Sequence, residues 1–474
     1  MEPTTSSDMT GGPKRATLFV VIIAVIIALG AAAVFYFPRV SEQSESVTVQ
    51  NQNPTAAVRT PRAVNGAVVG GYGWSANANE AKAAEEAVNK MKADMGGKTP
   101  RWAMVFSTVD YNTDTLAAEL QKRLGAEVKM SGITSWKGIM ASDGWHAGRS
   151  VGVLGIASDK VAFGVGTAAV GDEKGRTAAA EAIRAALADA GKTATDKPKI
   201  VLMNSVLGQE EDELKGVADV LGKDVPVLGA SAGDSDISGK WKEYANGRSY
   251  SSNVVMTLIY TDVKVGYIFS SGLGYLRTDK QAVVTKAKGR TIYEIDGRPA
   301  ADVYNEWLGG ELTNQLASKE KQVSILQQGI IDPLAVVVTG DKGISYYLTV
   351  HPIFINLPDK SLTSLAVIEQ GKNMSIMRGS PEAHELRAPL VIRMARAVGE
   401  IKQDEVAAGL ALFCACTHLV LGDDGVSRII PTMNKAFGGA PFIGAFTFGE
   451  EGPVPGVGNR HQNLIQNILI FGKN

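Results

Sequence analysis

The chain has 474 residues, of which 45% are hydrophobic, and its 48 Lys and Arg residues are balanced by 49 Asp and Glu residues. This length and hydrophobic content suit a globular protein of roughly two to four domains or repeats. The balanced charge argues against a nucleic-acid partner, because binding to phosphates requires an excess of basic side chains.

An apolar segment without charges covers residues 16–37 and is long enough to cross a bilayer as one helix. Lys14 and Arg15 precede the segment, whereas only Arg39 follows it closely. The positive-inside rule therefore favours a cytoplasmic stub at residues 1–15 and a globular part outside the cytoplasm, periplasmic or external. A cleaved signal peptide is the alternative, since three consecutive alanines inside the segment resemble a cleavage site.

Residues 38–62 are rich in Gln, Asn, Ser, Thr and Pro and contain few large apolar side chains. Such a composition cannot bury enough surface to fold, so this stretch is predicted to be a flexible linker.

The remaining chain repeats an alternation of strands and helices three times, the third copy being looser. The first copy is predicted to contain helices over 79–95 and 113–124 and strands over 102–106 and 128–135. The second has a helix over 175–190 and strands over 199–204 and 225–231, and the third has strands over 409–416 and 441–447 and a helix over 426–437. The predicted fold class is α/β, with repeated mixed sheets and layered helices, preceded by one transmembrane helix.

Several sequence runs in this part resemble the FIST family. They are PVLGASAGD at 226–234, the junction VTKAKGR…EIDGRPA at 284–300, FGGAPFIG at 437–444, TFGE at 447–450 and HQN at 461–463. The resemblance implies a FIST N domain over residues 63–287, with two internal repeats, and a FIST C domain over residues 288–474.

The resemblance implies a sensory module that binds small ligands and feeds signalling partners, without catalytic activity. No cofactor is expected, although some relatives look like haem-binding gas sensors. One departure from the family pattern concerns the residues after the cysteine-bearing strand, where relatives often carry an Arg and this chain has Thr417 and His418.

The best candidates for a site are the turns that follow the central strand of each repeat, because ligands bind beyond the ends of such strands. Their hydroxyls and carboxylates suit a small polar ligand carrying amine or hydroxyl groups, although the same side chains also stabilise turns. With neighbouring residues from the family motifs, the predicted ligand-binding set is Ser135, Ser231, Asp234, Asp236, Cys416, Thr447, Glu450, Glu451, His461 and Asn463.

Two further patterns suggest alternative chemistry. Residues 229–233 read G-A-S-A-G, which fits the nucleophile elbow of a serine hydrolase around Ser231. Cys414, Cys416 and His418 alternate and would share one face if they lay on a single strand, as a soft-metal or haem site would require.

The sequence thus predicts a membrane-anchored sensor of a small polar ligand that is not an enzyme. A partner protein is expected to carry the signal, since the 1–15 stub is too short to be an output domain. The alternatives are a haem- or metal-binding gas sensor and a hydrolase that uses Ser231.

Overall fold

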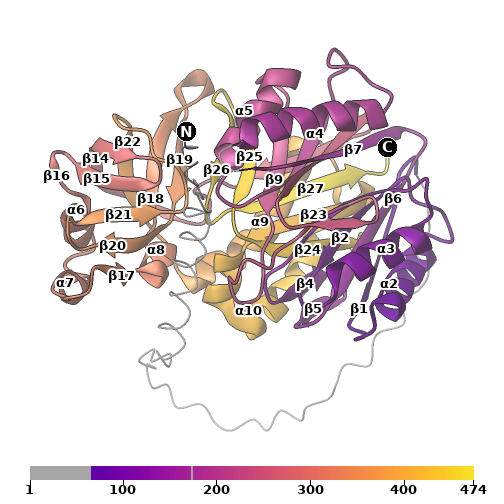
Figure 1. Cartoon of the computed structure of the whole chain (residues 1–474), viewed down its shortest axis with the longest axis horizontal. Helices are drawn as coiled ribbons and strands as arrows, with labels where there is room; N and C mark the ends of the chain where they lie inside the picture. Colours follow the sequence, from indigo (N-terminus) through magenta and orange to yellow (C-terminus); the bar gives the residue numbers. More distant parts are fainter. Residues whose placement is uncertain (1–65, 172–173) are drawn as a thin grey trace, which may run out of the picture.

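The computed structural model describes residues 66–171 and 174–474. It has the predicted α/β fold with mixed sheets, arranged as a large body of three six-stranded sheets and a smaller lobe built on a nine-stranded sheet (Figure 1). In these two ranges no helix is long and apolar enough to span a bilayer. The predicted span at 16–37 and the linker at 38–62 lie outside the described residues.

The three sheets of the body share one plan, in which a parallel pair of strands (β2–β3, β8–β9 or β23–β24) is flanked by antiparallel strands. The first sheet has the order β1 (Val69–Ser75), β6 (Val151–Ala157), β2 (Trp102–Ser107), β3 (Lys129–Thr134), β10 (Glu243–Ala245) and β11 (Arg248–Tyr250). The second has β7 (Val161–Ala169), β12 (Asn253–Thr261), β8 (Ile200–Ser205), β9 (Val227–Ser231), β25 (Glu450–Val454) and β26 (Gly458–Gln462). The third has β13 (Val265–Phe269), β27 (Gln466–Gly472), β23 (Val406–Cys414), β24 (Phe442–Thr447), β4 (Gly138–Ala141) and β5 (Gly144–Ala147).

Each sheet is completed by a hairpin from another repeat. Hairpin β10–β11, which follows β9, joins the first sheet; β25–β26, which follows β24, joins the second; and β4–β5, which follows β3, joins the third. The turns that lead into these hairpins therefore cross one another. Gly233 N donates to Thr134 O at 2.9 Å, and Trp136 N donates to Phe446 O at 2.9 Å.

Two helices cover each sheet of the body. They are α2 (Glu80–Asp94) and α3 (Thr113–Leu124), α4 (Gly175–Asp189) and α5 (Glu210–Leu221), and α9 (Pro381–Val398) and α10 (Ala415–Ala436). Helices α2 and α3 begin where Asn79 and Asn112 accept backbone hydrogen bonds as N-caps, close to the predicted starts. Helices α5 and α9 were not predicted, and α10 begins earlier than expected, with a break at Gly422.

The lobe is inserted between β13 and α9. Its sheet contains β17 (Gln322–Ser324), β20 (Pro352–Asn356), β21 (Ser361–Ser364), β15 (Thr291–Ile295), β14 (Leu276–Lys288), β22 (Asn373–Arg378), β18 (Leu334–Thr339) and β19 (Ser345–Val350), with β16 (Arg298–Pro299) beside β15. Helices α6 (Ala300–Trp307), α7 (Thr313–Leu316) and α8 (Leu326–Ile331) pack around it. An Asp-Gly turn precedes α6, with positive φ angles at Asp296 and Gly297.

The predicted domain boundary at 287/288 stays a prediction, but the third sheet joins β13 from before that boundary to β23, β24 and β27 from after it.

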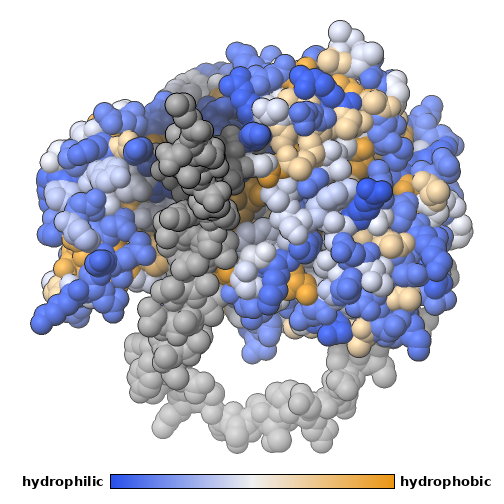
Figure 2. All heavy atoms as spheres, viewed as in Figure 1, coloured by the Kyte–Doolittle hydropathy of each residue, from blue (hydrophilic) through white to orange (hydrophobic). Residues whose placement is uncertain are grey.

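The three sheets of the body also share one core. Trp102 of β2 stacks on Phe163 of β7 with ring centroids 5.2 Å apart, and Phe471 of β27 packs against both rings. The outer face in view is mostly hydrophilic, with apolar side chains in small separate patches (Figure 2).

The close packing of α4 on its sheet depends on glycines in β7. A Cβ at Gly166 would overlap the backbone of Ala182 and Ala186 in α4. We expect Gly166→Ala to lower the free energy of unfolding by about 2–3 kcal/mol, because the helix must move away from the sheet. Urea denaturation of the variant measures this loss. Gly171→Ala is the matched control, since its Cβ would meet nothing closer than Lys174 Cδ at 3.6 Å, and an equal loss in both variants would contradict the packing argument.

Candidate functional site

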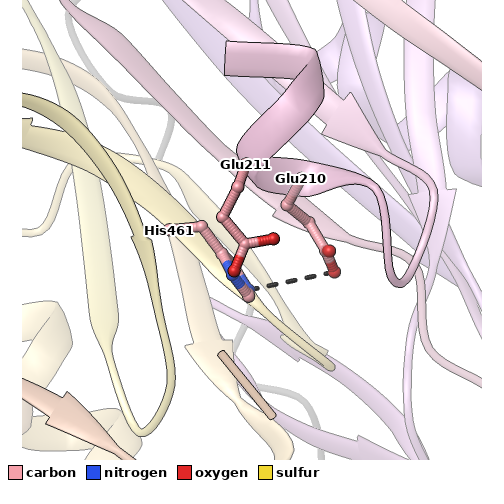
Figure 3. A group of neighbouring side chains, drawn as sticks. All are labelled: Glu210, Glu211 and His461. Carbon is pink, nitrogen blue, oxygen red and sulfur yellow. Dashed lines mark hydrogen bonds and ion pairs between the residues drawn. The ribbon is translucent and has the colours of Figure 1, made fainter. Parts of the chain in front are cut away.

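A cluster of charged side chains forms where helix α5 begins. Glu210 and Glu211 occupy the first turn of α5, where the unpaired backbone N–H groups of the helix favour negative charge. Figure 3 shows both carboxylates converging with His461, which comes from β26. Glu210 is fully buried and His461 is 3% exposed, so this is a buried polar cluster in which every charge needs a partner.

Arg290 supplies the positive charge of the cluster. It lies in the turn between β14 and β15 of the lobe, and its Nη2 lies 2.8 Å from Glu210 Oε2 and 3.0 Å from Glu211 Oε2. Val367 N, also from the lobe, donates to Glu211 Oε1 at 2.8 Å. The first turn of α5 therefore connects the body to the lobe through charge-assisted hydrogen bonds.

The ring of His461 is oriented by Glu211. Its Nδ1 lies 3.0 Å from Glu211 Oε1, and since a carboxylate only accepts, Nδ1 carries the proton. Its Nε2 has no hydrogen-bond partner among the described residues and lies 3.8 Å from Glu210 Oε1. A Cβ at Gly449 would meet His461 Nε2 at 2.7 Å and Glu210 Oε1 at 3.3 Å, so the glycine lets the chain pass close to both atoms.

Burial and neighbouring charges shift the pKa values of these acids in opposite directions. Burial by itself would raise the pKa of Glu211, but the His461 ring that hydrogen-bonds to it and the charge of Arg290 outweigh burial and hold this pKa far below its usual range. Burial and the neighbouring Glu210 and Glu213 raise the pKa of Glu451 well above its ordinary value. Glu211 is therefore ionised at neutral pH, whereas the surroundings of Glu451 favour its protonated form.

Ser231, predicted both as a ligand contact and as a possible nucleophile, belongs to this cluster. Its Oγ donates to Glu210 Oε1 at 2.9 Å, and the side chain is fully buried. Strand β9 ends at Ser231 and runs on into a loop and β10, so the strand–turn–helix geometry of a nucleophile elbow is not formed.

A second group of predicted residues lies around the end of β23, namely Cys416, Thr447, Glu450 and Asn463. The interpretation of Cys414, Cys416 and His418 as one strand face is wrong, because β23 ends at Cys414 and helix α10 begins at Ala415. Cys416 Sγ lies 3.7 Å from His351 Nδ1 instead. The Asn463 side chain reaches the same region, since its Oδ1 accepts from His351 N at 3.4 Å.

Thr447 and Glu450 bond to each other within this second group. Thr447 Oγ1 lies 2.7 Å from Glu450 Oε1, and Glu450 Oε2 accepts from Ile465 N at 3.3 Å. Burial, together with Cys414, raises the pKa of Glu450 well above its ordinary value.

The last three predicted residues, Ser135, Asp234 and Asp236, stabilise the crossing turns. Ser135 Oγ donates to Gly138 O at 2.6 Å and accepts from Phe446 N at 2.9 Å. Asp234 is buried and accepts from Lys240 N at 2.8 Å, whereas Asp236 is half-exposed and accepts from Ser238 N. Two surface hollows, of about 710 and 490 Å³, lie elsewhere and are lined by none of the predicted residues.

Sequence reasoning missed Glu210, Glu211 and Arg290. The four consecutive acids from Glu210 to Glu213 were a usable signal, because acids concentrate in the first turn of helices. No local pattern marks Arg290, which meets the acids only through the packing of the lobe on the body.

The cluster was tested for its fit to a metal ion or haem. One ligand atom from each of Glu210, Glu211 and His461 lies within 4.8 Å of the others, so these residues could hold a divalent cation. Arg290 competes for the same carboxylates. The surroundings of His461 do not suit haem, because carboxylates and a guanidinium stand where a porphyrin requires apolar walls.

The three interlocked sheets and the inserted lobe, joined by the buried charged cluster, define a repeat-built α/β protein. Comparison with protein families matches a FIST N domain to residues 101–298 and a FIST C domain to residues 300–453. The chain therefore belongs to the FIST family, with the two domains in tandem as predicted. FIST domains are sensory, ligand-binding modules of signalling proteins.

Individual relatives add little about function. The chain is 33% identical over 138 residues to the uncharacterized protein MJ1623 of Methanocaldococcus jannaschii, and the matched stretch covers only 27% of either protein. Among solved structures, cyanuric acid hydrolase from A. caulinodans matches 49% of this chain and 84% of its own at 13% identity and a TM-score of 0.27. A second cyanuric acid hydrolase matches 86% of this chain and 100% of its own length, at 9% identity and a TM-score of 0.33. PurLQS from Thermotoga maritima matches 87% of this chain and 75% of its own length, at 11% identity and a TM-score of 0.21. At these TM-scores the likenesses carry no argument.

The raised pKa of Glu451 predicts how stability depends on pH. The folded chain keeps a proton on Glu451 that the unfolded chain loses as the pH rises above about 4.3. The stabilising effect of this proton on the folded state is therefore complete below about pH 4.3. It is lost as the pH rises towards the pKa of Glu451 in the folded chain. We expect Glu451→Gln, which stays neutral, to lose less free energy of unfolding than the parent between about pH 5 and about pH 8.

Urea denaturation at the two pH values measures this difference. Glu127→Gln is the matched control, because Glu127 is exposed and its loss should leave the pH dependence unchanged. A Glu451→Gln variant with the parent's pH dependence would show that this carboxyl is ionised in the folded protein.

Proposed function

We propose that the chain is a sensor of a small polar ligand, which binds at the cluster formed by Glu210, Glu211, His461 and Arg290. The proposal rests on one observation above all: the buried His461 Nε2 has no hydrogen-bond partner among the described residues and lies 3.8 Å from Glu210 Oε1. Both atoms accept hydrogen bonds when His461 is protonated on Nδ1 only. A small donor, such as an ammonium or hydroxyl group, is the chemistry that this arrangement favours.

The position of the cluster supports a signalling role. Glu210 and Glu211 belong to the body, Arg290 and Val367 belong to the lobe, and His461 lies on the hairpin β25–β26 that the third repeat contributes to the second sheet. A ligand that takes up the acceptors of Glu210 changes the strength of the Glu210–Arg290 ion pair. Ligand binding would then shift the arrangement of lobe and body, which a partner protein could read.

Thermal-shift measurements on the full chain test this function, with ethanolamine and methylamine as donor probes. Binding should raise the melting temperature of the parent in a saturable way. Gly449→Ala should abolish the shift, because its methyl group crowds His461 Nε2 without altering any charge, and Glu210→Gln should weaken it. Gly171→Ala is the matched control and should respond as the parent does.

Zn²⁺ forms a separate arm of the same experiment. A stoichiometric shift with Zn²⁺ that Gly449→Ala and His461→Gln abolish, in the absence of any amine effect, would identify the metal-sensor alternative. An amine shift that survives in Gly449→Ala would place the ligand elsewhere and refute the proposed site.

We further propose that residues 16–37 anchor the chain in the membrane with the FIST domains outside the cytoplasm. The support is the sequence itself, namely a segment of 22 residues without charge and the basic pair Lys14 and Arg15 before it. A signalling partner that spans the membrane is then needed to carry the response inwards.

Alkaline carbonate extraction tests the anchor. The full chain should stay with the membrane pellet, whereas Ile26→Arg/Ile27→Arg should move to the supernatant, because two charges at the centre of the span oppose insertion. Protease added to intact spheroplasts should digest the FIST domains. A mature chain that begins after the apolar segment, seen by mass spectrometry, would instead establish a cleaved signal peptide.

A further inference from the structure

The guanidinium of Arg387 is the most conspicuous unpaired charge of the described chain. Arg387 lies on helix α9 and is 2% exposed. Its Nη2 donates to Ser270 Oγ at 2.7 Å, but Nε and Nη1 donate to no acceptor among the described residues. A buried guanidinium stays protonated, so a lack of hydrogen-bond acceptors leaves its charge uncompensated.

The neighbouring side chains do not supply a counter-charge. The carboxyl of Glu450 bonds to Thr447 Oγ1 and Ile465 N and not to Arg387, and burial, together with Cys414, raises its pKa well above its ordinary value. The adjacent Cys416 thiol and burial raise the pKa of Cys414 in the same way, which keeps Cys414 a neutral thiol. Burial also raises the pKa of Tyr275, whose ring lies 5.7 Å from the guanidinium carbon.

Two histidines close to this region are neutral as well. Burial and the charge of Arg387 lower the pKa of His384 to about 3, and burial lowers the pKa of His351 to about 4. His384 Nε2 lies 3.2 Å from the Tyr275 hydroxyl, which itself donates to Ile330 O, and His384 Nδ1 has no partner in the described chain. Among the described residues, Arg387 therefore has one hydroxyl as its hydrogen-bond partner and no carboxylate within hydrogen-bonding distance.

The walls of this region come from different parts of the chain. Ser270 and Tyr275 lie in the connection from β13 to the lobe, Arg387 and His384 lie one turn apart on α9, and Cys414 ends β23. Gly274 packs so closely that a Cβ there would meet Arg387 Cδ at 3.0 Å. A ligand in contact with Arg387 would thus touch the segment that joins the lobe to the body.

We infer that Arg387 anchors a second binding site, whose ligand is a small carboxylate. A monoanion balances the single charge of the guanidinium, and its two oxygens accept from the free N–H groups. A dianion such as phosphate would bring an excess negative charge into a region without another cation. This site lies apart from Glu210 and His461 and does not depend on the function proposed for them.

Thermal-shift titration of the full chain with sodium acetate, at constant ionic strength set by chloride, tests the inference. Acetate should raise the melting temperature of the parent, and Arg387→Met should reduce the apparent affinity by about 30-fold or more. Without acetate, Arg387→Met should melt at a higher temperature than the parent, because an apolar side chain replaces an uncompensated buried charge. Arg393→Met, at an exposed position of the same helix, is the matched control and should leave both properties unchanged.

A second variant covers the case in which Arg387→Met does not fold. Ser270→Asp places a carboxylate where Ser270 Oγ now accepts from Arg387. This internal anion should raise the melting temperature in chloride and remove the response to acetate. A destabilised Ser270→Asp that still responds to acetate would overturn the inference, as would an acetate response in Arg387→Met equal to that of the parent.

Inorganic phosphate provides the last comparison. A response to acetate without a response to phosphate at the same ionic strength supports the carboxylate site. A larger response to phosphate, or equal responses to both salts, would refute a site specific for carboxylates.

Discussion

The exchange of hairpins among the three sheets is the constraint on which the rest of this molecule depends. Each sheet ends with two strands that another repeat provides, so no repeat can complete its own backbone hydrogen bonding alone. An unpaired strand edge is prone to association, and the exchange pairs the edges of β3, β9 and β24 with strands from another repeat. The turns that lead into the hairpins must then pass each other in the interior. Ser135 shows the consequence, because its hydroxyl bonds to its own turn and to Phe446 of the third repeat.

The polar turns bring charged side chains into the interior of the protein. In one place these charges are paired, and in another a charge lacks a partner of opposite sign. At the start of α5, two carboxylates share one guanidinium and one histidine, so each buried charge has a partner. At Arg387, the acceptor is a single neutral hydroxyl. Removing one member of a buried charged network is costly, since the remaining charge is stranded. The two places would therefore respond to the proposed ligands in different ways: the first by exchanging partners, the second by gaining one.

The lobe contacts both the cluster at the start of α5 and the region around Arg387, so a change at either one could move the lobe. It is inserted between β13 and α9, so both of its connections to the body pass near the third sheet. Arg290 and Val367 bind the lobe to α5, while Ser270 and Tyr275 lie in the segment that enters the lobe beside Arg387. A change in the pairing of Arg290 or of Arg387 would act on the same contact between lobe and body. This shared contact is a physical basis for coupling between the two proposed sites.

The sequence by itself determined the α/β class, most helices and central strands, the threefold repeat and the FIST family, because these follow from local periodicity, capping residues such as Asn79 and Asn112, and ordered motifs. It also indicated that the turns at Ser135, Ser231 and Thr447 matter. Only the tertiary structure decided what these turns contact. Glu210, Arg290 and His461 are far apart in the chain, and their meeting results from the exchange of hairpins and the packing of the lobe, neither of which leaves a local signal. The course of the chain at Cys416, where α10 begins instead of a longer strand, was likewise set by packing, since the local alternation of residues fits both.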